Sequence, residues 1–207
     1  MNLPSKLLED AVQSFAQLPG IGQKSALRMV LHLLRMQPDQ VDHFGETLLR
    51  LRKELRYCTN CHNVCSDELC TICSDGKRIS GLVCVVEDIR DVIAIENTAQ
   101  FKGHYHVLGG LISPMDGVGP SQLHIDSLVD KVAKGNTEEV VVALSTTMEG
   151  DTTLFYLYKK LKPFNIRIST LARGVSIGGE LEYADEVTLG RSIVNRVLYE
   201  NELVKGS

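Results

Sequence analysis

Four of the six cysteines in this 207-residue chain form two CxxC pairs, and these pairs restrict its fold more than any other feature. Eight residues separate the pairs, whose members are Cys58, Cys61, Cys70 and Cys73. Each CxxC turn directs two thiolates toward one point, so two turns provide the closed tetrahedral shell of a structural zinc ion. Free thiols and disulfides are the alternatives, but pairs this close together favour one structural zinc per chain.

The two remaining cysteines have different settings. Cys65 lies between the pairs as a competing ligand, although the two CxxC turns make the simpler set. Cys84 lies within the apolar run of residues 82–86, which predicts a strand packed in a core.

The composition is that of an ordinary globular protein, with 43% hydrophobic and 23% charged residues. We find neither a signal peptide nor an apolar run of about 18 residues, and we expect a reducing, cytoplasmic setting in which CxxC pairs bind metal.

The net charge is −4, but residues 1–56 hold eight Lys and Arg against six Asp and Glu. This uneven distribution permits an anion-binding face before the cysteines.

Two helices with a glycine turn between them are predicted for the start of the chain. Apolar residues recur at helical spacing on each side of residues 18–22 (Leu-Pro-Gly-Ile-Gly), at Leu8, Val12, Phe15, Ala26, Val30, Leu33 and Leu34. Gly20 and Gly22 let the backbone amides of the turn approach a phosphate closely. Lys24 and Arg28, four residues apart, add charge on the same helix face. A purely structural turn is the alternative.

This segment resembles the helix-hairpin-helix, a module that grips the DNA backbone without reading bases. The resemblance implies sequence-independent, salt-sensitive binding through Gly20, Gly22, Lys24 and Arg28. A third amphipathic helix follows Pro38, with Asp39 as the predicted N-cap and basic residues near its end. This helix leads the chain to the first cysteine.

Strands and helices alternate from residue 81 onward. Strands are predicted at 81–87, 104–108, 138–144 and 166–171, and helices at 89–95, 121–134 and 152–161. This alternation predicts a multidomain α/β protein in which a mainly parallel sheet is covered on both faces. Ligands of such sheets bind beyond the carboxyl ends of the strands.

Carboxylates follow two of these strands, and their placement resembles the Toprim domain of topoisomerases and primases. Glu87 matches that domain's first glutamate, and Glu149 matches the last position of its DxDxE cluster. Ser145 and Thr147 stand at the two aspartate positions, where hydroxyls are poor Mg²⁺ ligands. Glu87, Glu149 and Asp151 are therefore a Mg²⁺ site, an acidic partner surface or ordinary surface carboxylates; the sequence leaves Mg²⁺ binding open.

Taken in order, the segments resemble the bacterial recombination mediators of the RecR family from end to end. The segments are a helical hairpin unit (1–56), a four-cysteine zinc finger (57–76), a Toprim domain (81–172) and a C-terminal segment (173–207). The last segment contains residues 174–185, GVSIGGELEYAD, compared in that family with a Walker B element. Ser176 departs from the family's usual proline, and residues 193–203 suit a helix.

The resemblance implies a non-enzymatic DNA-binding protein of recombinational repair. It would act with RecO, and with RecF where present, to promote RecA loading at single-stranded gaps. Family members form rings, typically tetramers, around duplex DNA, and four copies would multiply the phosphate contacts. An active Toprim enzyme and a zinc-stabilised RNA-binding module are the rival interpretations.

Overall fold

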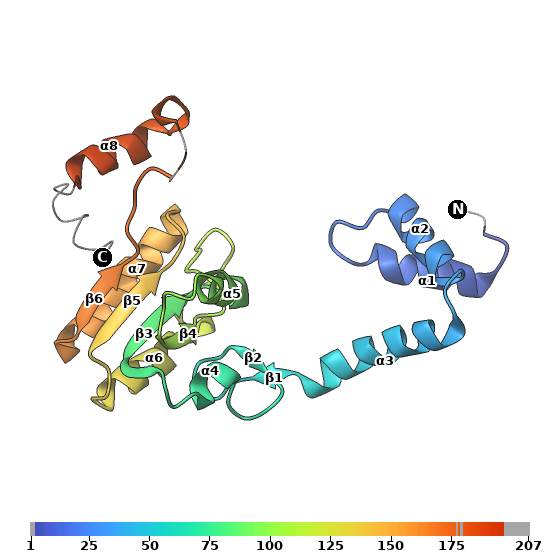
Figure 1. The fold of residues 1–207 in the computed structure, drawn as a ribbon, viewed down its shortest axis with the longest axis horizontal. Helices are drawn as coiled ribbons and strands as arrows, with labels where there is room; N and C mark the ends of the chain where they lie inside the picture. Colours follow the sequence, from blue (N-terminus) through green and yellow to red (C-terminus); the bar gives the residue numbers. More distant parts are fainter. Residues whose placement is uncertain (1–2, 177, 179, 197–207) are drawn as a thin grey trace. The chain divides into compact units, whose positions relative to one another are not determined.

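The computed structural model describes residues 3–176, 178 and 180–196 and divides the chain into two compact units, residues 1–56 and 57–207 (Figure 1). Among the described residues, no helix is long and apolar enough to cross a membrane.

The first unit consists of three helices: α1 (Lys6–Ala16), α2 (Gln23–Leu33) and α3 (Pro38–Glu54). Val12 of α1 packs on Ala26 and Val30 of α2, and these three side chains form the small core. Helix α3 buries none of its residues. Its predicted N-cap, Asp39, is wrong: the helix begins at Pro38, whose fixed φ suits the first helical position, and Gln37 is the N-cap.

The second unit begins with the cysteine-rich segment. Strands β1 (Arg56–Tyr57) and β2 (Val64–Cys65) pair, and the one-turn helix α4 (Thr71–Ser74) follows. The chain then enters a four-stranded parallel sheet in the order β4-β3-β5-β6. The strands are β3 (Ile79–Val86), β4 (Gly103–Val107), β5 (Glu139–Ala143) and β6 (Arg167–Thr170).

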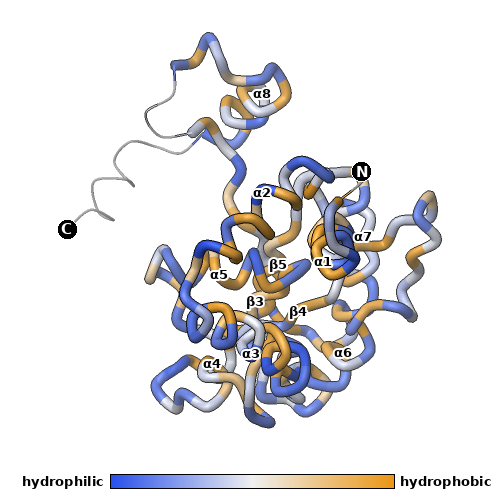
Figure 2. Tube along the Cα trace, turned by 90° about the vertical axis from the view of Figure 1, so that its right-hand side faces the viewer, coloured by the Kyte–Doolittle hydropathy of each residue, from blue (hydrophilic) through white to orange (hydrophobic). Residues whose placement is uncertain are grey.

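Helices cover both faces of this sheet, which confirms the predicted α/β class. Alternation along β3 sends Val83 and Val85 to one face, where α6 (Ile125–Ala133) and α7 (Met148–Leu161) pack. Cys84 and Val86 point to the other face, beneath α5 (Ile89–Asn97). Figure 2 shows the strands as the hydrophobic centre of this unit.

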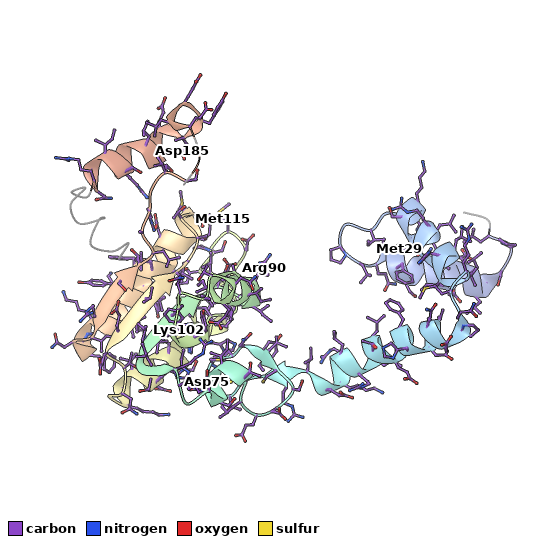
Figure 3. All side chains as sticks on the ribbon, in the orientation of Figure 1. Met29, Asp75, Arg90, Lys102, Met115 and Asp185 are labelled. Carbon is purple, nitrogen blue, oxygen red and sulfur yellow. The ribbon has the colours of Figure 1, made fainter. Side chains whose placement is uncertain are left out.

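Three predicted helix boundaries are wrong. The helix predicted at 121–134 is α6, which begins only at Ile125. Helix α7 begins at Met148 rather than Thr152, so Glu149 and Asp151 lie in its first turn instead of a loop. The last described helix is α8 (Glu186–Val194), capped by Asp185, which is labelled in Figure 3. Of the helix predicted at 193–203, only its first two residues lie in α8, and residues 197–203 lie outside the described chain.

Candidate metal centre and nucleic-acid interface

The four cysteines of the CxxC pairs converge on one point. The Sγ atoms of Cys58, Cys61, Cys70 and Cys73 all lie within 4.8 Å of one another. The first three side chains are buried and Cys73 is half-buried. Four converging sulfurs form a donor set that suits tetrahedral zinc and leaves no open coordination position, so the predicted structural zinc site is confirmed.

Tight backbone turns aim these sulfurs. After the first pair, His62 adopts the left-handed conformation with φ 61°, and its N–H donates to the carbonyl of Cys58 at 2.9 Å. At the start of the second pair, Cys70 caps α4, and its Sγ accepts from the N–H of Cys73 at 3.4 Å. Each CxxC pair thus closes a turn that holds both of its sulfurs on the inner side.

Hydrogen bonds distribute the charge among the thiols unequally. Bonding to Cys61, reinforced by the Asn60 amide, lowers the pKa of Cys73 to about 5. The pKa of Cys61 is raised by its hydrogen bond with Cys73 and by burial. Burial raises the pKa of Cys70 to about 11. Because zinc binds thiolates, its binding must displace protons from the group and strengthens as pH rises.

The other two cysteines lie outside the four-sulfur group. The thiol of Cys65 donates to the carbonyl of Asp67 at 3.0 Å, and Cys65 is not among the converging sulfurs. Cys84 is buried in the sheet, where burial raises the pKa of its thiol to about 12. Its predicted role as a core residue is confirmed.

The metal centre is docked on the edge strand of the sheet. The N–H of Val107, at the end of β4, donates to the carbonyl of Cys61 at 2.8 Å. Strand β4 has β3 on one side only, so this bond covers part of its exposed edge. Ile72 of α4 packs against the core beneath α5 and secures the second CxxC pair.

The glycine turn of the first unit has the predicted hairpin form. Gly20 has φ +77°, a conformation that glycine adopts without strain, and the N–H of Ile21 donates to the carbonyl of Leu18 at 3.1 Å. Gly22 is the N-cap of α2. The turn therefore ends at a helix N-terminus whose amides are open to an anion.

Cations follow directly on the same helix. Lys24 and Arg28 are exposed and form no ion pair with any described residue. Together with Arg35 they line a shallow groove of about 310 Å³ that has no acidic residue in its walls. The structure thus brings the predicted cations together on one face beside the glycine turn.

The carboxylates at the sheet edge lie in two places. Glu87 follows β3 near Asp88 and Asp91, and burial, assisted by these two carboxylates, raises its pKa. Glu149 and Asp151 lie in the first turn of α7, where Asp151 pairs with Arg173 at 3.0 Å. Among the described residues, only the cysteines make a group of three or more potential ligands within 4.8 Å of one another.

The two residues at the Toprim aspartate positions have structural contacts. Thr147 is the N-cap of α7, and its hydroxyl accepts from the N–H of Gly150 at 3.2 Å. The hydroxyl of Ser145 lies 3.2 Å from that of Thr147. A Cβ on Gly150 would lie 1.9 Å from the carbonyl oxygen of Ser145, so this close approach requires glycine.

Two residues at the metal centre, Asn60 and Lys131, were not predicted from the sequence. The Asn60 amide donates to Cys73 Sγ at 3.3 Å, and the Lys131 ammonium donates to the Asn60 backbone carbonyl at 2.6 Å. Asn60 lies inside a CxxC turn, where its polar side chain was a weak signal. Lys131 comes from α6, and only the fold brings it to the cysteines.

Models of known families match successive parts of the chain. They describe the helix-hairpin-helix of RecR over residues 8–51, the four-cysteine zinc finger domain of RecR over 55–75, a Toprim domain over 81–172 and the C-terminal part of RecR over 174–197. These matches cover the hairpin, the metal centre and the sheet described above.

Whole-length relatives agree. "Recombination protein RecR" of Parabacteroides distasonis is 59% identical over 193 residues, which cover 93% of each chain. The protein of the same name from Flavobacterium psychrophilum is 59% identical over 201 residues, 97% of this chain and 98% of its own. That of Amoebophilus asiaticus is 55% identical over 199 residues, 96% of this chain and all of its own. The chain therefore belongs to the RecR family of recombination proteins.

Proposed function

We propose that this protein is a non-enzymatic DNA clamp of recombinational repair, which acts with RecO, and with RecF where present, to promote RecA loading at single-stranded gaps. The DNA-binding part of this proposal rests on the hairpin. There a glycine turn and a helix N-terminus lie beside Lys24 and Arg28, which form no ion pair with a described residue. Such a surface favours phosphate contacts, which do not depend on base sequence.

The sheet edge supports binding without cleavage. Thr147 already caps α7, and Asp151 already pairs with Arg173. A phosphoryl-transfer site of two metal ions requires several carboxylates directed at the same point. We therefore infer that Glu87, Glu149 and Asp151 serve as an acidic partner surface.

Incubation with gapped DNA tests the proposed clamp. A labelled duplex with a single-stranded gap, titrated with the protein in Mg²⁺ at low salt, should shift in a native gel. The same DNA should then run at full length in a denaturing gel. Cleaved DNA would refute the non-enzymatic assignment, and DNA that never shifts would refute the clamp.

Self-association is part of this proposal. Apolar side chains recur along one stripe of α3 and remain exposed in the single chain: Phe44, Leu48 and Leu51. A helix with such a stripe is expected to pack against another surface, and a second copy of the chain supplies one within a ring. Light scattering on the purified protein measures the number of copies.

Charge reversal tests the acidic partner surface. Glu87→Lys/Glu149→Lys/Asp151→Lys should lose most of its capture by immobilised RecO, because complementary charge speeds and orients association. Asp126→Lys, which changes an exposed carboxylate in the first turn of α6, is the matched control and should be captured normally. Undiminished capture of the triple variant would exclude this surface as the RecO site.

A further inference from the structure

Helix α6 of the Toprim domain and the residue before it make three contacts with the first CxxC turn. The Lys131 ammonium donates to the Asn60 backbone carbonyl at 2.6 Å. Ser127 Oγ lies 2.9 Å from His62 Nε2, and the His124 ring stacks on the His62 ring at 3.8 Å with 6° between the planes. Asn60 and His62 are the two neighbours of Cys61, so this ligand is held from both sides along the chain.

The contact of Lys131 continues to a second cysteine. The Asn60 side chain donates from its amide to Cys73 Sγ at 3.3 Å, while the backbone carbonyl of Asn60 accepts from Lys131. Asn60 belongs to the first CxxC turn and Cys73 to the second. One unbroken path therefore leads from α6 through Asn60 to a sulfur of the opposite pair.

The negative charge of the four thiolates explains why a cation lies at the start of this path. Four thiolates around one Zn²⁺ carry a net charge of −2, and three of the four cysteines are buried, where an uncompensated charge is costly. Burial lowers the pKa of Lys131, while the charges of Cys73, Cys61 and Cys58 act in the opposite direction. The sulfurs are thus the groups that favour a cation at this position.

We propose that Lys131 is an outer-sphere cation of the zinc centre, which offsets the charge of the four thiolates and positions Cys73 through Asn60. The Toprim domain then does more than carry the zinc finger, since one of its helices helps to retain the metal. Removing such a hydrogen-bonded outer partner typically weakens metal binding about 10–100-fold.

Three substitutions at one position separate charge from hydrogen bonding. Lys131→Met removes both, Lys131→Gln keeps an N–H donor without charge, and Lys131→Arg keeps both. Lys134→Met is the matched control, since Lys134 ends the same helix and lines the same cavity as Lys131 but is exposed and makes no ion pair with a described residue. Zinc affinity is measured by chelator competition on the full chain, and the Co²⁺-substituted spectrum reports the thiolate geometry.

We expect Lys131→Met to bind zinc about 10–100-fold more weakly and Lys131→Gln to lie between it and the wild type. Lys131→Arg and Lys134→Met should bind zinc as the wild type does. If Lys131→Met does not fold, the zinc affinities of Lys131→Gln and Lys131→Arg are compared instead, and they show whether the charge at this position strengthens zinc binding. Equal zinc affinity in the charged and uncharged variants, or an equal loss in Lys134→Met, would overturn the proposal.

Discussion

Replacing Cys61 by serine should abolish stoichiometric zinc binding and unfold the zinc finger. The Sγ of Cys61 is fully buried and lies 3.5 Å from that of Cys70, so no water replaces it without opening the finger. Structural zinc contributes an apparent binding free energy of about 10–16 kcal/mol to small fingers, and this is also their folding free energy. Metal analysis should fall from one zinc per chain to nearly none.

The effect should extend into the Toprim domain. The carbonyl of Cys61 accepts the N–H of Val107, and Ile72 of α4 packs into the core beneath α5. Loss of the finger uncovers the edge of β4, and such edges promote aggregation. The melting temperature of the Cys61→Ser protein should therefore fall, and its tendency to aggregate should rise.

Cys65→Ser is the control for this experiment. The thiol of Cys65 donates to the Asp67 carbonyl, a contact that a serine hydroxyl can also make, and Cys65 lies outside the converging sulfurs. This variant should keep one zinc and the wild-type melting temperature. A Cys61→Ser protein that retained one tightly bound zinc per chain would contradict the assignment of Cys61 as a required ligand.

The sequence was a good guide wherever the determining signal was local. The spacing of the cysteines predicted the ligands, because a CxxC turn places its sulfurs with little help from the rest of the fold. The apolar run around Cys84 predicted a buried strand, because the signal again lies in consecutive residues. The glycine turn before α2 was likewise predicted from residues that are neighbours in the chain.

Other features depend on contacts between distant residues. Lys131 is 71 positions from its partner Asn60, and nothing in the pattern of an amphipathic helix distinguishes it from a solvated lysine. The start of α7 was missed because its apolar periodicity begins late, whereas the cap is Thr147. In the sequence, Thr147 stands at a Toprim aspartate position and therefore indicates a lost metal ligand, although Thr is also a preferred N-cap.

Removing the hairpin cations should have the second large effect. Lys24→Ala/Arg28→Ala should bind duplex DNA at least about 100-fold more weakly, because charge-assisted hydrogen bonds contribute about 1.5–3 kcal/mol each and two of them are lost. Both side chains are exposed and contribute nothing to the core of Val12, Ala26 and Val30, so the variant should fold normally. Affinity is measured by fluorescence anisotropy at several salt concentrations.

Salt dependence identifies the mechanism behind such a loss. Each phosphate contact releases counterions and contributes about 0.9 to the slope of log affinity against log salt, so the double variant should lower that slope by about two per bound chain. Lys6→Ala/Arg50→Ala removes the same charge from the first unit, but these cations pair with Asp10 and Glu54. This control should retain both affinity and slope. An equal loss of DNA affinity in the two variants would mean that DNA responds only to the net charge of this unit. An unchanged slope in the hairpin variant would mean that the glycine turn is only a structural connection.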